Sequence, residues 1–294
     1  MFIDIHVHTT RLPGPPRIHS DKMTYAPPQQ LLAAYDEVGI ERAVVLPPVN
    51  PECEYGVQAV EEVIEMAENN SRFIPFCNVD PRAMTNSIDA PFEWLFKYYR
   101  DKGCKGVGEV CANLSMLDPR VQAMFKGAEA AGLPLTFHLS VAEGVDYGLV
   151  VGAGMPELEI SLQRFPNLKI FGHSQTFWAE MGAHPTWNDR MGYPKGKIEE
   201  EGRLPILMRT YGNLYGDLSA GSGANALRRD REYAIRFLNE FQDRLLFGTD
   251  ICQPTMPTLK PLAEFLLDLR NSGDISETVF RKVARENAIR LLGL

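Results

Sequence analysis

The stretch MFIDIHVH, residues 1–8, combines the composition of a buried strand with two histidines. Its apolar and β-branched residues predict a strand over Met1–Val7. Because side chains two residues apart on a strand point to the same side, His6 and His8 can bind one ion together. The H-x-H pattern alone is weak evidence, since a surface or core histidine pair accounts for it equally well. Its meaning depends on what the other strands carry.

Seven more apolar runs follow, separated by amphipathic segments. They are Arg42–Leu46, Arg72–Val79, Cys104–Val110, Leu133–His138, Leu168–His173, Leu214–Ser219 and Leu245–Asp250. Each run is a predicted strand, and each is followed by a helical stretch. Eight βα units predict an α/β fold, a (β/α)8 TIM barrel that occupies residues 1–294 as a single domain.

The segments between the runs have the spacing of helices with one apolar face. Asp118-Pro119 and Gly132 bracket one of them as its cap and its stop. The expected core-facing stripes are Val121, Met124, Phe125 and Ala128; Val57, Val60, Ile64 and Ala67; and Tyr233, Ile235, Phe237, Leu238 and Phe241. We expect these stripes to pack the helices onto the barrel.

The composition is that of an ordinary globular protein, with 294 residues, 45% hydrophobic and 23% charged. A net charge of -8 argues against nucleic acid or an anionic membrane surface as a partner. The five cysteines are odd in number and form no C-x-x-C pair, so neither a disulfide framework nor a thiolate zinc site is expected. Reduced thiols, with no export signal and no transmembrane span expected, favour the cytoplasm.

Four polar residues stand at the last position of a predicted strand. Glu109, His138, His173 and Asp250 end or nearly end their runs. The carboxyl ends of barrel strands meet at one rim, so these residues are expected to join His6 and His8 there. Histidines satisfied only by local hydrogen bonds would have no reason to gather at that rim. Imidazole and carboxylate donors predict one or two divalent metal ions, zinc first, with manganese, iron, nickel and cobalt also compatible.

Two predicted loops are longer than simple connections and follow the carboxyl ends of strands. They span Thr9–Ala26 and Ser174–Gly202. The second contains Trp178 and Trp187 among several Gly and Pro residues, and it is expected to form a partly ordered lid over a small-molecule pocket. The alternative is an Ω-loop that only covers the mouth of the barrel.

With these motifs in place, the chain resembles the amidohydrolase superfamily, particularly its amidohydrolase-2 branch. The resemblance rests on DIHVH, GVGEV, the FHLS and FGHS histidines, NLYGDLSAGSG, LLFGTDI and NAIRLLGL, which together span nearly the whole chain. It implies that His6, His8, His138 and Asp250 bind metal. It also implies that Asp250 moves protons.

Glu109 departs from the pattern of the decarboxylases in this branch, where a single metal is held without a fourth-strand glutamate and the histidine matching His173 is an acid or base. Binuclear members similar to the TatD nucleases do have such a glutamate, which bridges two ions. By that resemblance His6, His8 and Asp250 hold one ion, His138 and His173 hold the other, and Glu109 holds both. The alternative is that Glu109 only orients a ligand histidine. Lys105 begins its strand, so a carbamylated lysine bridge is not expected.

The expected activity is hydrolysis of an ester, lactone, amide or phosphoester bond in a small-molecule substrate. Asp250 and His173 are the expected catalytic residues, with Asp250 taking a proton from the attacking water and passing it to the leaving group. The first alternative is a metal-dependent non-oxidative decarboxylase in which His173 protonates carbon. The second is a metal-binding protein without catalysis, which the intact ligand set argues against.

Several residues remain open between a role in substrate binding and an ordinary structural one. Arg11, Arg17, His19, Arg228 and Arg229 either grip an anionic group or are solvated surface residues, and Trp178 and Trp187 either stack on a ring or pack the lid. Barrels of this type often form homodimers. The sequence itself does not fix the oligomeric state.

Overall fold

The structure, a computed structural model, describes residues 1–12, 14 and 25–294. Strands and helices alternate along most of the chain. The strands are β1 Phe2–Val7, β2 Ile40–Val45, β3 Phe73–Pro75, β4 Val107–Val110, β5 Leu135–Ser140, β6 Leu149–Val150, β7 Ile170–His173, β8 Leu214–Asp217 and β9 Leu245–Leu246. The helices are α1 Pro28–Val38, α2 Val60–Asn69, α3 Phe92–Asp101, α4 Pro119–Ala131, α5 Pro156–Arg164, α6 Gln175–Ala179, α7 Trp187–Met191, α8 Arg203–Thr210, α9 Ala220–Arg228, α10 Arg231–Glu240, α11 Pro261–Asn271, α12 Glu277–Arg281, the π-helical turn η1 Lys282–Glu286 and α13 Asn287–Leu292.

All eight predicted strands are present, and the (β/α)8 barrel is confirmed. The additional short strand β6 pairs with β5 at the edge of the barrel wall. The last predicted strand, Leu245–Asp250, is regular only over Leu245–Leu246. Its continuation still hydrogen-bonds to β1, so the backbone there remains part of the wall.

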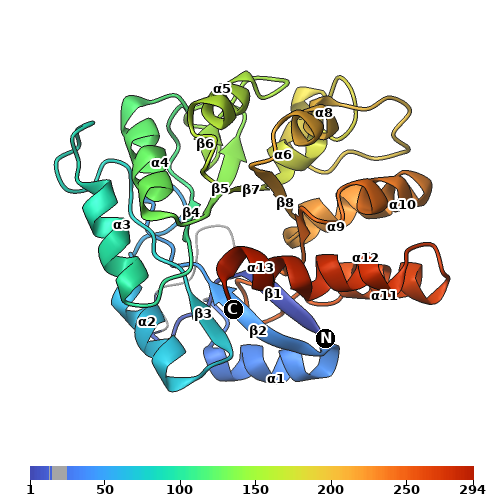
Figure 1. The fold of residues 1–294 in the computed structure, drawn as a ribbon, viewed down its shortest axis with the longest axis horizontal. Helices are drawn as coiled ribbons and strands as arrows, with labels where there is room; N and C mark the ends of the chain where they lie inside the picture. Colours follow the sequence, from blue (N-terminus) through green and yellow to red (C-terminus); the bar gives the residue numbers. More distant parts are fainter. Residues whose placement is uncertain (13, 15–24) are drawn as a thin grey trace.

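Two backbone seams close the wall into a barrel. One joins β3 to β4, where the amide of Gly108 donates to the carbonyl of Cys77 at 2.8 Å. The other joins the segment after β9 to β1, where the amide of Asp250 donates to the carbonyl of His6 at 2.8 Å. Figure 1 shows the helices around the outside of the strands. The second seam places the ends of β1 and β9, far apart in sequence, side by side.

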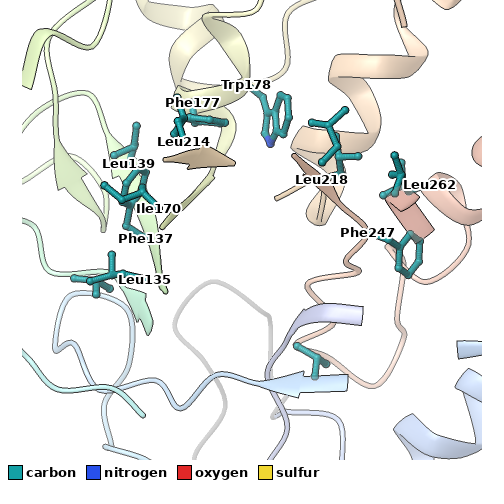
Figure 2. Packing of buried hydrophobic residues seen from close by; sticks show 14 of the residues in the cluster. Leu135, Phe137, Leu139, Ile170, Phe177, Trp178, Leu214, Leu218, Phe247 and Leu262 are labelled. Atoms are coloured by element: carbon teal, nitrogen blue, oxygen red, sulfur yellow. The ribbon is translucent and has the colours of Figure 1, made fainter. Parts of the chain in front are cut away.

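The buried side chains form an outer layer and an inner layer. On β5, Leu135, Phe137 and Leu139 belong to the outer layer beneath the helices (Figure 2), so the residues between them face the barrel interior. The inner layer includes Ile3 and Phe171 and also side chains of the C-terminal helix α13, which therefore plugs one end of the barrel. On β1 and β7 these apolar residues precede the histidines, which leaves the histidines at the opposite end.

The helix punctuation predicted from the sequence is largely present. Asp118 caps α4 by accepting a hydrogen bond from the amide of Arg120, and Gly132 ends the helix with a left-handed φ of 71°. The prediction that Val57 is the first core-facing residue of its helix was wrong. Val57 is 70% exposed and precedes α2, which begins at Val60.

The segment Ser174–Gly202, which was expected to form a partly ordered lid, contains regular helices and packs against the barrel. It contains α6 and α7, and the Trp178 side chain is buried against the barrel, with its indole N–H donating to the carbonyl of Asp217 at 2.9 Å. The buried Arg190 guanidinium donates to the carbonyl of Val151 and faces the Glu180 carboxylate. Of the two readings for Trp178, packing is therefore the correct one. Within the described part of the chain, no helix is both long and apolar enough to cross a membrane.

We expect Leu135→Ala to lower the free energy of unfolding by about 2–5 kcal/mol, because it leaves a cavity at a fully buried position between β5 and the helices. The matched control is Ile206→Ala on α8, where the side chain is 42% exposed and the loss should stay under about 1 kcal/mol. Urea denaturation followed by circular dichroism measures both. Equal losses in the two variants would contradict the layer assignment.

Candidate metal centre

Irregular strand pairing aims the first donors into the barrel. The register of β1 against β2 shifts within Asp4–Val7, and the register of β4 against β5 shifts within Val107–Val110. Such a shift re-aims the side chains on the bulged strand. His6, His8 and Glu109 lie in or beside these two segments. The register shifts therefore occur in the strands that carry candidate ligands, where the side chains do not simply alternate between the two faces of the wall.

Gly108 allows the backbone of β4 to reach its neighbour. Its φ is +132°, and a Cβ atom at this position would lie 2.4 Å from the carbonyl oxygen of Thr136 on β5. Only glycine accommodates both the conformation and the contact. This close approach brings the next residue, Glu109, against the histidines of the neighbouring strands.

Four donor atoms come together at the mouth of the barrel. His6 Nε2 lies 3.2 Å from His8 Nε2, 3.4 Å from Glu109 Oε2 and 3.6 Å from Asp250 Oδ1. His8 Nε2 lies 3.3 Å and 3.5 Å from the same two oxygens. A tetrahedral ion with bonds of about 2.0–2.1 Å separates its ligands by about 3.3–3.4 Å. The spacing of these donors therefore fits a single divalent ion.

The hydrogen bonds on the far sides of the two imidazoles fix which nitrogens have free lone pairs. His8 Nδ1 donates to the carbonyl oxygen of Leu46 at 2.8 Å, since a carbonyl can only accept. His6 Nδ1 lies 2.6 Å from the Asp217 carboxylate. In the neutral rings both Nε2 atoms are then unprotonated, and they face each other beside two carboxylates. A positive charge between them, from a bound cation or a proton, would relieve the repulsion of their lone pairs.

Without a metal, a proton on His6 supplies that positive charge. Burial lowers the pKa of His6, but the carboxylates of Asp217, Glu109 and Asp250 outweigh burial and raise that pKa well above its ordinary value. Burial alone would raise the pKa of the Glu109 carboxyl. The charge on His6 and hydrogen bonds from the histidines outweigh burial and hold this pKa well below its ordinary value. The cluster is thus arranged for a buried cation.

Glu109 divides its two oxygens between two sets of histidines. Oε2 faces His6 and His8, whereas Oε1 lies 3.0 Å from His138 Nδ1 and 3.8 Å from His173 Nε2. A carboxylate shared in this way can bridge two ions. His138 thus turns Nδ1 toward Glu109, and its other nitrogen, Nε2, is buried without a hydrogen-bond partner among the described residues.

His173 is fixed from below by two polar side chains. Its Nδ1 lies 3.0 Å from the hydroxyl of Ser219 and 3.5 Å from the carboxylate of Asp217. Burial and the charge on His6 lower the pKa of His173 to about 4. The ring is therefore neutral at pH 7, and its Nε2 points toward Glu109 and Asp250.

Asp250 is the most accessible of the clustered donors. Its side chain is 24% exposed, against 0% for His6 and 7% for Glu109. Its backbone is left-handed with a φ of 52°, a conformation in which Asp is several-fold enriched among non-glycine residues. The Asp250 carboxylate is thus placed between the ion site and solvent.

Sequence reasoning missed two buried carboxylates that hold the ligands. Asp217 ends β8 and could have been found by the strand-end rule, but its motif served only for the family resemblance. Asp4 sits within MFIDIHVH and accepts hydrogen bonds from the amides of His6 and Thr249 at 3.0 and 2.9 Å. Burial raises the pKa of Asp4 to about 6. A charged residue inside an otherwise apolar strand was the available signal.

The centre opens into a small cavity. Its lining comprises His8, Tyr25, Pro48, Cys53, Glu54, Glu109, Cys111, His138, Tyr147, Asp250 and Cys252. A second cavity shares Tyr25, Pro48 and Glu54 with it. The two cavities therefore adjoin beside the donor cluster.

The other described residues that were singled out from the sequence do not line this cavity. Arg11 forms a surface ion pair with Glu65, Arg228 is exposed, Arg229 is half-buried against α9 and the Ser174–Gly202 segment, and Trp187 is 53% exposed. Arg17 and His19 lie outside the described residues. Arg11, Arg228 and Arg229 are therefore not placed to bind an anionic group of a substrate beside the donor cluster.

Comparisons with solved structures agree with the barrel. The chain is similar to 5-carboxyvanillate decarboxylase LigW from Sphingomonas paucimobilis (19% identity, 100% of this chain and 99% of that one, TM-score 0.61). It is also similar to a probable 2-pyrone-4,6-dicarboxylic acid hydrolase from Acinetobacter baumannii (14%, 100% and 99%, 0.59). A third is a dihydroxybenzoic acid decarboxylase from Polaromonas with bound manganese (15%, 100% and 97%, 0.57). At these identities the likeness shows the fold alone.

No curated protein matches the sequence. The Amidohydro_2 family model, described as Amidohydrolase, matches residues 3–294, which include all six predicted ligands. Because the match spans almost the whole chain, the protein belongs to this amidohydrolase family.

Proposed function

We propose that this protein is a metal-dependent hydrolase that cleaves an ester, lactone, amide or phosphoester bond in a small molecule. The observation that carries the proposal is the convergence of His6, His8, Glu109 and Asp250 with donor spacings of 3.2–3.6 Å. A neutral structural histidine would instead have an acceptor for its N–H group and a donor for its other ring nitrogen. Here each Nε2 faces another ligand atom.

These four residues would hold the first ion. His138, His173 and the second oxygen of Glu109 would hold a second ion if two are bound, although these donors are spaced more loosely. Nitrogen and oxygen donors suit zinc, and also manganese, which one of the similar structures contains. When bound, the ion polarises a carbonyl or phosphoryl oxygen and acidifies water.

Asp250 is the residue that we assign to proton transfer. It lines the cavity, and its two oxygens face His8 and His173 at 3.5 and 3.8 Å. From this position it can accept a proton from the attacking water and return it to the leaving group. Asp217 and Leu46 hold the imidazoles in the tautomers that keep Nε2 free.

His173 is better suited to holding an ion than to acting on substrate. It is 1% exposed and does not belong to the cavity lining among the described residues. Since a general acid must reach the group it protonates, this placement favours hydrolysis through Asp250 over carbon protonation by His173.

A metal-dependent non-oxidative decarboxylase is the second candidate. It is favoured by the similarity to two structures named as decarboxylases, which cover this chain completely. In that reaction the substrate would be an aromatic acid, and the cavity would have to bind its carboxylate without an arginine or lysine from the described lining. None of the five cysteines is in a disulfide, which supports a reducing compartment such as the cytoplasm for either activity.

We expect Asp217→Asn to weaken metal binding about 10- to 100-fold, because the amide no longer holds the His6 imidazole as a charged acceptor does. Competition with a chromogenic zinc chelator measures the affinity. Asp101→Asn on α3, where the carboxylate is 68% exposed, is the matched control and should leave it unchanged. An unchanged affinity in both variants would show that Asp217 does not orient a ligand.

We expect Asp250→Asn to reduce kcat by about 10²–10⁴-fold, because the proton acceptor is lost. Zinc- and manganese-loaded proteins are assayed with p-nitrophenyl acetate, δ-valerolactone, p-nitrophenyl phosphate and 2,6-dihydroxybenzoate, with product and CO2 release followed separately. Asp243→Asn, with its side chain 64% exposed, is the control.

Two outcomes would overturn this assignment. Near-normal turnover by a fully metal-loaded Asp250→Asn variant would remove its role in proton transfer. CO2 release from the aromatic acid without turnover of any ester or lactone would replace hydrolysis by decarboxylation.

A further inference from the structure

Tyr147 lines the cavity of the candidate metal centre, although it does not stand at the end of a strand as the predicted ligands do. It follows β5, and its ring packs on the imidazole of His138 with centroids 4.4 Å apart and planes inclined at 48°. Glu109 and Asp250 line the same cavity. The phenol is therefore next to the donor cluster while belonging to a separate segment.

The backbone around Tyr147 is fixed against the ligand strands. Gly148 has a φ of +110°, and a Cβ atom there would lie 2.9 Å from the carbonyl oxygen of His138. Its amide donates to the carbonyl of Cys111 at 2.8 Å, and its own carbonyl accepts from the Asn113 side chain at 3.1 Å. The backbone beside Tyr147 is thus hydrogen-bonded to the segment after β4 and packed against β5.

The hydroxyl of Tyr147 differs from those of two other tyrosines near the centre. Tyr25 donates to Glu54 and Tyr35 donates to Asp4, whereas the Tyr147 hydroxyl has no hydrogen-bond partner among the described residues. A phenol has an ordinary pKa of about 10, which is well above neutral pH. The group therefore remains a neutral phenol, which can donate an O–H bond.

We infer that Tyr147 is a further catalytic residue whose hydroxyl donates a hydrogen bond to the substrate oxygen that gains negative charge during the reaction. The inference rests on the proposed hydrolase function. No covalent bond or proton transfer at Tyr147 is required, since the O–H only stabilises the oxyanion. Such a hydrogen bond favours substrates that have a carbonyl or phosphoryl oxygen beside the scissile bond. This oxygen would have to reach both the ion site and the phenol.

The test compares Tyr147→Phe with Tyr98→Phe, a control on α3 where the side chain is 45% exposed. The first readout is the binding of acetohydroxamate, a two-oxygen chelator of divalent ions, to zinc-loaded protein by calorimetry. We expect Tyr147→Phe to raise its Kd about tenfold and Tyr98→Phe to leave it unchanged. Zinc content and the thermal unfolding midpoint should be the same in all three proteins.

The second readout is turnover of whichever ester or lactone the wild-type protein hydrolyses. We expect Tyr147→Phe to lower kcat about 10²-fold and to change KM by less than threefold, because the hydrogen bond strengthens as charge develops.

Unchanged hydroxamate binding in Tyr147→Phe would overturn the inference, and so would a wild-type protein that takes up zinc but binds no hydroxamate. Absence of zinc uptake by the wild type would instead refute the metal centre on which the proposed function depends. The tenfold change in Kd for Tyr147→Phe alone, with zinc content preserved, would support the inference even before a natural substrate is known.

Discussion

The constraint on which the mouth of this barrel depends is the approach of His6 Nε2 to His8 Nε2, 3.2 Å apart and bordered by two carboxylates. Facing lone pairs repel unless a positive charge lies between them. The surrounding structure prevents either ring from rotating away. The Nδ1 atom of His6 is held by Asp217, and that of His8 is held by the carbonyl of Leu46. The rings cannot turn away without breaking a buried hydrogen bond, which is costly.

This constraint accounts for features that would otherwise destabilise the barrel. Asp4, Glu109 and Asp217 are carboxylates at least nine-tenths buried, and burying such groups without partners costs several kcal/mol each. Each is instead hydrogen-bonded to the segments that carry the ligands, so its burial contributes to their placement. Register shifts on β1 and β4 and the left-handed backbone of Asp250 occur at the same rim. Such departures persist where neighbouring packing determines them, as at functional sites.

Much of the fold was predictable because buried parallel strands have a simple pattern, and because polar residues at strand ends stand out against it. The partners of the ligands were harder to find. Asp217 and Asp4 act through hydrogen bonds to other residues, which only the three-dimensional pairing of β8 and β9 with β1 reveals. The segment Ser174–Gly202 misled for a different reason. Its Gly and Pro residues suggested a loop, but tertiary packing of Trp178 and the Arg190–Glu180 pair orders two short helices within it.

The geometry also distinguishes the two proposed ion sites that the family resemblance left equivalent. Around His6 and His8 the donors are as close as one ion requires, and every ring has its tautomer fixed. On the other side, Glu109 Oε1 is near His138 but 3.8 Å from His173, and the Nε2 atom of His138 has no partner among the described residues. The first site is therefore preorganised, whereas the second would need its imidazoles to move. Because preorganisation reduces the cost of binding, the first ion should bind more tightly, and Asp250, which borders that site and lines the cavity, would act even with one ion bound.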